Sequence, residues 1–305
     1  MFAIAALVSG FSAPAFAQST LYGLAYSGDN GPASLYSIDK TTGTATLIGP
    51  TGFERCSGMD ADASGTLYAT CERTDGSNEQ VLVIIDPSSG AGVEVGPIGI
   101  ASSSEDVMCD ISFRNSDGVL YAYQCRNIPV HNIYTIDKNS GAGTFVGNSG
   151  FSFTTGNGLT FSLGDVLYHA RGTAPGWTLN TVNQITGLSS VLTVLSDTPL
   201  IGERLNAMDA DPDTGIIYAV ANLSGGGSDT LATVDPATGT VTLIGLSTSG
   251  LDAIAFIPES AVIGGTIISI DSTALMVAGL QGSAFWLIPV VISAAGIGLV
   301  LVKRK

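Results

Sequence analysis

A repeated turn phrase is the sequence feature that most constrains how this chain can fold. A β-rich run that ends in Ile-Asp or Val-Asp, followed by a short turn with glycine, returns about every fifty residues. The clear turns begin at Asp39, Asp86, Asp137 and Asp235, and a degenerate copy begins at Asn183. Asp39 and Asp235 are 196 residues and four steps apart, which gives a mean spacing of 49 residues. Repeats of this length are typical of folds in which each unit buries its surface against its neighbours.

Each repeat contains four runs with the alternation of β-strands, joined by short turns, which predicts antiparallel pairing. The first repeat begins at its second strand, Leu21-Tyr22, and a spare first strand occurs at 251–256. A last strand that completes the first sheet closes a ring and removes the open edge. We therefore predict an all-β, five-bladed β-propeller with strand closure between the N-terminus and residues 251–256. Its blades are 18–49 with 251–256, 58–96, 109–147, 156–192 and 206–245.

The two ends of the chain lie outside the repeats and predict export and membrane anchoring. Residues 1–17 are apolar and end in Ala-Phe-Ala, the small-x-small pattern of a signal-peptidase site. The last 19 residues of an apolar segment at 275–302 carry no charge and would span about 28 Å as a helix, close to the thickness of a bilayer core. We expect a signal peptide at 1–17, the propeller at 18–257, a tether at 258–274, a transmembrane anchor at 275–302 and a cytoplasmic basic tail at 303–305.

The charge balance excludes one class of partner. The chain has 11 Lys and Arg against 26 Asp and Glu, a formal net charge of -15, whereas nucleic-acid binding needs clustered cations. Hydrophobic residues make up 45% of the chain and charged residues 12%, which argues against disorder. The partners we expect are the membrane, through the C-terminal helix, and cell-surface proteins or glycans. The predicted location is the extracytoplasmic face of the cell membrane.

Two phrases carry a family resemblance. Leu35-Tyr36-Ser37-Ile38-Asp39 and Asp235-Pro236-Ala237-Thr238-Gly239 resemble phrases of secreted β-propellers of prokaryotic cell surfaces, of the surface-layer and PEP-CTERM-associated types. The resemblance covers about 18–257 and implies a fold rather than an activity. The tail departs from the PEP-CTERM pattern, because Pro258-Glu259-Ser260 stands well before the apolar span. We therefore expect a plain membrane anchor.

Four cysteines in an exported chain predict two disulfides. Cys56 and Cys71 flank the first hairpin of the second repeat, and Cys109 and Cys125 flank the same hairpin of the third. We predict the pairs Cys56–Cys71 and Cys109–Cys125. The alternatives are free buried thiols or a metal site, and no Cys-x-x-Cys spacing supports the latter.

These two pairings follow from an expected strand register. A register with Met59 opposite Tyr68 also places the first two cysteines opposite each other. A register with Phe113 opposite Tyr121 does the same for the second pair. Each disulfide is thus expected to join neighbouring strands of one hairpin.

Alternating carboxylates suggest calcium at one predicted turn. Asp209, Asp211 and Asp213 are followed by Gly215, and carboxylates spaced in this way can converge on a hard cation. Val220 stands where an EF-hand would place glutamate. We favour a solvated hairpin turn, since Asp and Gly are expected there anyway. Calcium is the alternative, and it is the only cofactor that the sequence suggests.

One position of the first strand is polar in every repeat. In blades one to five it is Asp252, Asp60, Ser112, Thr160 and Asp209. Because the first strand of a propeller blade is innermost, these side chains are expected to form a ring around the axial channel. Carboxylates so placed repel unless they bind a cation, take up a proton or accept hydrogen bonds. The ring is either a site for a cation or small polar ligand, or a set of side chains that satisfy backbone groups between blades.

Motifs for catalysis are scarce in this sequence. It has two histidines, His131 and His169, which we interpret as structural, and it has no Gly-x-Ser-x-Gly elbow. Asn222 begins an Asn-x-Ser glycosylation sequon, for which a chance match is the alternative. We predict a binding, interaction or cell-envelope structural role, with an enzyme less favoured. The alternative function is a propeller-type glycoside hydrolase, or another hydrolase, that uses channel carboxylates.

Overall fold

The computed structural model describes residues 18–26, 31–100, 107–125, 131–151, 158–173, 176–195, 204–222 and 228–258. All regular elements in these ranges are β-strands, which confirms the all-β prediction for this part of the chain. The predicted signal peptide, anchor and basic tail, and the tether after Pro258, lie outside the described residues. Within the described ranges, no helix is long and apolar enough to cross a membrane.

Neighbouring strands pair antiparallel, and the third, fourth and fifth repeats each form a four-stranded sheet. The third repeat contains β7 (Val107–Phe113), β8 (Leu120–Cys125), β9 (Asn132–Ile136) and β10 (Gly143–Asn148). The fourth contains β11 (Leu159–Phe161), β12 (Leu167–Thr173), β13 (Gly176–Val182) and β14 (Ser189–Val194). The fifth contains β15 (Arg204–Ala210), β16 (Ile217–Asn222), β17 (Thr230–Val234) and β18 (Val241–Leu246).

The first two repeats share one seven-stranded sheet. In spatial order its strands are β19 (Leu251–Ile257), β1 (Thr20–Tyr26), β2 (Pro32–Ile38), β3 (Ala45–Ala61), β4 (Leu67–Glu72), β5 (Gln80–Ile85) and β6 (Gly92–Pro97). The 17-residue strand β3 pairs with β2 through its first part and with β4 through its last part. It is therefore the outer strand of one repeat and the inner strand of the next.

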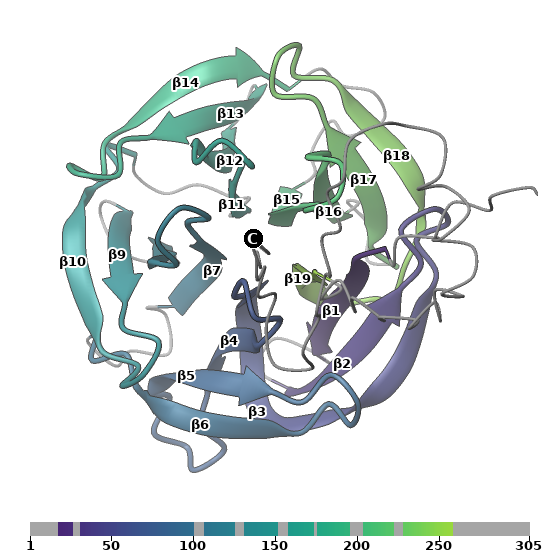
Figure 1. Cartoon of the computed structure of the whole chain (residues 1–305), viewed down its shortest axis with the longest axis vertical. Helices are drawn as coiled ribbons and strands as arrows, with labels where there is room; N and C mark the ends of the chain where they lie inside the picture. Colours follow the sequence, from purple (N-terminus) through teal and green to yellow (C-terminus); the bar gives the residue numbers. More distant parts are fainter. Residues whose placement is uncertain are drawn as a thin grey trace, which may run out of the picture. The chain divides into compact units, whose positions relative to one another are not determined.

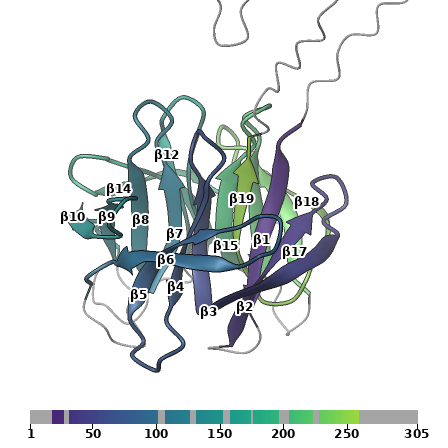
Figure 2. The ribbon, with the colours of Figure 1, turned by 60° about the horizontal axis from the view of Figure 1, so that its bottom comes forward.

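The sheets of residues 18–258 surround a central axis, with β7, β11, β15 and β19 innermost and β6, β10, β14 and β18 outermost (Figure 1). This arrangement is that of a β-propeller. The first and last strands lie side by side (Figure 2), and their register places Leu21 opposite Phe256 and Tyr22 opposite Ala255. As predicted, residues 251–256 complete the sheet that contains β1.

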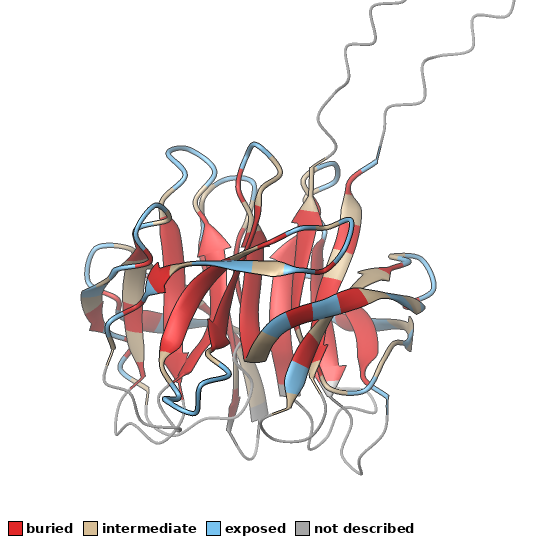
Figure 3. Cartoon of the chain, turned by 90° about the horizontal axis from the view of Figure 1, so that it is seen from below, coloured by how far each residue is buried: buried red, intermediate tan, exposed pale blue. Residues whose placement is uncertain are grey.

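Buried side chains fill the spaces between neighbouring sheets, and the strands near the axis are the most buried (Figure 3). One cluster of buried residues joins the first two repeats. In it, Leu24 and Leu35 pack with Met59, Leu67 and Val83. Inner strands such as β7 are buried along their whole length, because both of their faces contact a neighbouring repeat.

Both predicted disulfides are present, Cys56–Cys71 and Cys109–Cys125. The register that suggested them is wrong by one residue, because Tyr68 lies opposite Asp60 and Tyr121 lies opposite Ser112. A β-bulge precedes these positions in each inner strand, between Glu54 and Gly58 and between Met108 and Asp110, so the pairing at the cysteines differs from the pairing at the tyrosines. A one-residue shift moves every side chain to the other face of a sheet, so the ring positions depend on this correction.

Glycines hold neighbouring repeats close together at the outer strands. Gly49, at the end of one outer run, packs on Gly90 in the turn of the next repeat, and Gly96 packs in the same way on Gly141. A Cβ atom at Gly90 would collide with the Gly49 carbonyl, and its backbone has a φ of +81°. The glycine content therefore reflects close approach between repeats as well as turns.

Candidate functional site

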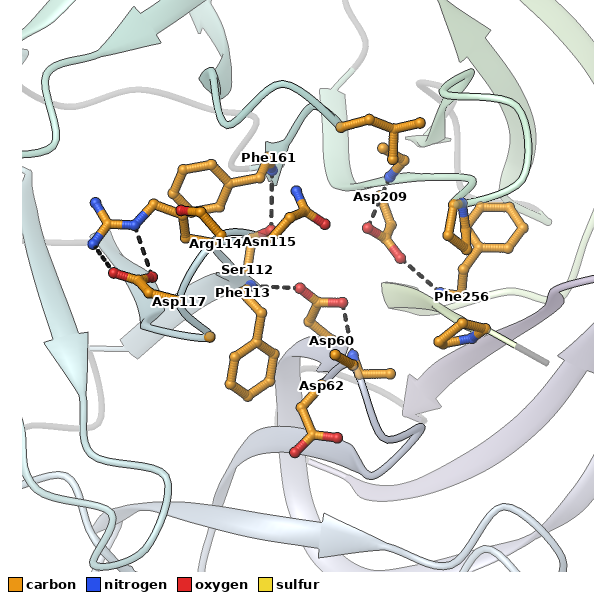
Figure 4. Close-up of a pocket in the computed structure, with 18 residues that line it drawn as sticks. Asp60, Asp62, Ser112, Phe113, Arg114, Asn115, Asp117, Phe161, Asp209 and Phe256 are labelled. Atoms are coloured by element: carbon orange, nitrogen blue, oxygen red, sulfur yellow. Dashed lines mark hydrogen bonds and ion pairs between the residues drawn. The ribbon is translucent and has the colours of Figure 1, made fainter. Parts of the chain in front are cut away.

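A cavity of about 420 Å³ opens at the end of the axis where the inner strands turn into the second strands (Figure 4). Its lining includes Asp60, Ser112 and Asp209 from three inner strands. Pro258, at the end of the described chain, also lines it. The cavity thus opens at the end of the axis at which β19 (Leu251–Ile257) ends.

The inner position opposite the tyrosine of each second strand defines the axial ring. Its members are Asp60, Ser112, Thr160, Asp209 and Ala255. Four of the five predicted ring residues therefore occupy equivalent positions. The prediction of Asp252 is wrong: it lies three residues before Ala255, and its carboxylate accepts a 2.9 Å hydrogen bond from the Tyr26 hydroxyl. A Leu-Asp pair suggested that alignment, whereas the register with β1 sets the actual one.

Ring side chains accept backbone N–H groups from the next repeat. The Asp60 carboxylate accepts the N–H of Phe113 at 2.6 Å, and the Asp209 carboxylate accepts the N–H of Phe256 at 2.6 Å. The Ser112 hydroxyl oxygen accepts the N–H of Phe161 at 3.0 Å. These bonds favour the second reading of the ring, in which its side chains satisfy backbone groups between repeats.

Among the hydrogen bonds of the described residues, the ring residue before each aspartate accepts no N–H group from the next repeat. The Ala255 side chain has no acceptor, and the Thr160 hydroxyl donates to the carbonyl of Phe161 at 3.2 Å. Asp60 and Asp209 therefore also accept the N–H that follows them in their own strands, at 2.7 and 2.8 Å. One carboxylate satisfies two N–H groups where a serine satisfies one, which explains the choice of residue at these positions.

Both aspartate side chains point into the cavity (Figure 4). Burial raises the pKa of Asp60 to about 7, against the lowering effect of its hydrogen bonds. Burial, followed by the nearby charge of Asp60, raises the pKa of Asp209 well above its usual range. The pair therefore retains a proton at a pH where isolated aspartates are fully ionised.

Asp110 is an axial carboxylate that the sequence reasoning missed. It is fully buried in β7 and accepts the N–H groups of Leu159 at 2.7 Å and Met208 at 3.2 Å, so it joins three repeats. Burial raises its pKa well above the usual range. The equivalent positions of the other four repeats are Gly58, Gly158, Ala207 and Ala253. A lone carboxylate among glycines and alanines was the signal that could have revealed it.

Three phenylalanines form the apolar wall of the cavity, and they too were missed. Phe113, Phe161 and Phe256 each follow a ring position, and all three line the cavity. Their rings pack edge-on against tyrosines of the preceding repeat, with centroids 5.4, 5.3 and 5.2 Å apart. In the other two repeats the equivalent residues are Ala61 and Ala210.

The predicted calcium residues are not brought together. The Asp211 carboxylate accepts hydrogen bonds from the Ser19 hydroxyl at 2.8 Å and from Lys40 at 3.0 Å. Asp213 accepts the Ser19 N–H at 2.6 Å, whereas Asp209 points into the cavity. In the part of the chain that the structure describes, no group of three or more His, Cys, Asp or Glu side chains could hold a metal ion. The turn instead anchors the start of the propeller.

The two histidines lie outside the cavity, between the third and fourth repeats. His131 and the Tyr123 hydroxyl are hydrogen-bonded at 2.5 Å, and the Tyr123 ring lies 3.9 Å from that of His169. Burial lowers the pKa of His131 to about 4 and that of His169 to about 3. Both are therefore neutral near pH 7. Asn222 ends β16, and the rest of its sequon lies outside the described residues.

Comparison with known proteins supports the fold. No protein-family model matches the sequence, and no curated protein matches it either. A chain in the crystal structure of a nidogen/laminin complex is similar, with a TM-score of 0.50 and 10% identity over 78% of this chain and 98% of that chain.

Two further similarities have lower TM-scores. TolB from Acinetobacter baumannii has a TM-score of 0.46 at 13% identity, over 79% of this chain and 58% of that chain. GH43B of a Bacteroides ovatus xyloglucan PUL has a TM-score of 0.47 at 14% identity, over 77% of this chain and 57% of that chain. Identities this low concern the fold alone. The resemblance to surface-layer and PEP-CTERM-associated propellers gains no support from these comparisons.

Proposed function

We propose that this chain is a membrane-held, extracytoplasmic binding protein, a five-bladed β-propeller whose axial cavity takes a small organic cation. The observation that carries the proposal is the cavity itself. Two buried carboxylates, Asp60 and Asp209, and three phenylalanines line it. The predicted leader and anchor supply the location, and the two disulfides suit an oxidising compartment outside the cytoplasm.

The count of five blades divides the seven-stranded sheet in two. Strand β3 closes one four-stranded group with β19, β1 and β2, and opens a second with β4, β5 and β6. These two groups and the three four-stranded sheets correspond one to one with the five sequence repeats. Five blades also match the five copies of the turn phrase.

A cation would replace the proton that the aspartate pair retains. Two carboxylates removed from water and placed close together are stabilised by any positive charge between them. Asp62 and Asp117, at the rim of the cavity, are already paired with Lys138 and Arg114. Among the ion pairs of the described residues, none involves the other two cavity carboxylates, Asp60 and Asp209. The phenylalanine wall favours an alkylated ammonium group, which aromatic surfaces attract.

Calorimetry with choline and its neutral carbon isostere, 3,3-dimethylbutanol, tests this function. We expect the full chain in detergent to bind choline and not the isostere, because only choline carries the charge. Asp60→Asn and Asp209→Asn should each weaken binding by about tenfold or more, the loss of one charge interaction in a desolvated site. Asp39→Asn, in an exposed turn, is the matched control and should leave binding unchanged. Equal binding of both probes, or choline binding of unchanged affinity in Asp60→Asn, would refute a cation site.

The two cavity carboxylates also favour the second candidate function, a glycoside hydrolase. Such enzymes pair a carboxylic acid of raised pKa with an ionised carboxylate, and Asp60 and Asp209 lie together beside aromatic side chains. Against it, the carboxylates of both residues already accept two backbone N–H groups each. A screen of aryl glycosides decides: turnover that Asp60→Asn abolishes supports the hydrolase, whereas turnover unchanged in that variant excludes these carboxylates as its catalytic pair.

A further inference from the structure

Ser19, near the start of the described chain, is hydrogen-bonded to an acidic turn of the last repeat, and we call this turn its seat. The Ser19 backbone N–H donates to the Asp213 carboxylate at 2.6 Å, and the Ser19 hydroxyl donates to Asp211 at 2.8 Å. Ser19 is only 4% exposed, while the preceding Gln18 is exposed. This seat is built from residues more than 190 positions apart in the sequence. It lies directly before β1, the strand that pairs with β19.

The charges of this seat are only partly balanced. Lys40 pairs with Asp211 at 3.0 Å and also donates to the Ser19 hydroxyl oxygen at 3.4 Å. Asp213 takes part in none of the ion pairs found in the described ranges. Among the described residues, the hydrogen bond that it receives from outside its own turn comes from the neutral Ser19 N–H. A further cation at this point would complete the balance.

We infer that the turn containing Asp211 and Asp213 is a binding site for the chain's own α-ammonium group, which removal of the predicted leader creates at Gln18. Neighbouring Cα atoms are about 3.8 Å apart, so a charge on the Gln18 nitrogen lies one residue from the nitrogen that already bonds Asp213. The inference rests on the exported state assumed in the proposed function. Leader removal then strengthens the contact between the last and first repeats, and the mature chain closes more firmly than its precursor.

The pH dependence of this site has a defined sign. The groups that face it are Asp211, Asp213, Lys40 and Tyr218. An α-ammonium group normally loses its proton near pH 8, so its contribution to stability is present below that pH and is lost as the pH rises above it.

The test compares two forms of the full chain in detergent, both beginning at residue 18, one with a free α-amine and one acetylated. Both carry Gln18→Ser, because an N-terminal glutamine can cyclise and lose its charge. We expect the free-amine form to melt higher at pH 6.5 by up to about 2–4 °C, the upper limit for one exposed ion pair in a domain of this size. The difference should vanish at pH 10 and in 1 M salt, since it depends on charge.

Two variants and one mass measurement complete the test. Asp213→Asn should abolish the difference between free and acetylated forms, whereas Asp235→Asn, in an exposed turn of the same repeat, should leave it intact. Equal melting of the two forms, or a difference that survives in Asp213→Asn, would overturn the pairing. The mass of the chain recovered from the exporting cell tests export separately: residue 18 first supports leader removal, and an intact leader overturns the maturation step.

Discussion

At the level of single residues, the type of residue at a ring position follows the number of backbone N–H groups that its side chain accepts. Ser112 satisfies one N–H, whereas Asp60 and Asp209 each satisfy two because the repeats before them supply none. The sequence pattern identified these three positions correctly as polar and axial. It could not locate Ala255, because an alanine gives no sign that it belongs to a polar ring.

The simplest residue-level prediction concerns Ser112. Ser112→Ala removes the acceptor of the buried Phe161 N–H while leaving the shape of the site almost unchanged. We expect a loss of about 1–3 kcal/mol in the free energy of unfolding, the cost of one unsatisfied buried group. Urea denaturation measures it, with Ser190→Ala on exposed β14 as control. Equal stability of the two variants would show that the ring bond has no structural role.

A second residue-level prediction uses pH. The pKa of Asp60 is raised from 3.8 to about 7, so the folded chain holds a proton that the unfolded chain has lost between these values. Its contribution to stability is full below pH 4 and is lost as the pH rises through 7. Asp60→Asn lacks this trend, so its stability relative to wild type should increase with pH, by at most about 1.4 kcal/mol per unit.

The pH profile of the wild type must be compared with that of Asp60→Asn, because two histidines change the free energy of unfolding with pH in the opposite direction. The lowered pKa values of His131 and His169, about 4 and about 3, make stability rise with pH up to the unfolded histidine value of 6.5. The wild-type profile is therefore a sum of opposing trends. Urea midpoints of both proteins from pH 4 to 7 give the difference directly, and parallel profiles would contradict the raised pKa of Asp60.

At the level of elements, neighbouring repeats contact each other through either a phenylalanine or an alanine of the inner strand. The residue that follows the turn aspartate indicates which of the two is present. Where the turn aspartate is followed by lysine, as at Lys40 and Lys138, the same repeat carries a cavity phenylalanine. Where proline follows, at Pro87 and Pro236, the inner strand carries alanine instead. The sequence contains this pattern, but it emerges only once the register is known.

The lysine-containing contact predicts coupling between distant residues. Lys138 pairs with Asp62 of the preceding repeat at 2.7 Å and lies over the ring of Phe113, 5.9 Å from its centroid. A double-mutant cycle of Lys138→Met and Phe113→Leu should give a coupling of about 0.5–1 kcal/mol in unfolding free energy. Asn139→Ala, at the exposed neighbouring position, should show none with Phe113→Leu. Additive effects of the lysine and phenylalanine changes would mean that the contact contributes nothing.

At the level of the whole molecule, the spacing of the repeats and the spare strand were enough to predict a closed all-β ring. Details that depend on bulges were not predictable, because alternation alone does not show where an inner strand gains a residue. The one-residue error at Tyr68 and Tyr121 arises in this way, whereas Asp252 was misplaced by three residues because its Leu-Asp pair resembles the first strands of other repeats. Asp110 was missed because it departs from the repeat pattern that revealed the rest.

The central claim is that ring closure creates an axial cavity in which a cation displaces a proton from Asp60 and Asp209. Calorimetric titration of the full chain with choline at pH 7, in two buffers of different ionisation enthalpy, counts the protons released on binding. The account predicts release of a fraction of one proton to one proton per bound choline, and a smaller release from Asp60→Asn, because only Asp209 remains to give up a proton. Binding without proton release, or equal release from the variant, would contradict it.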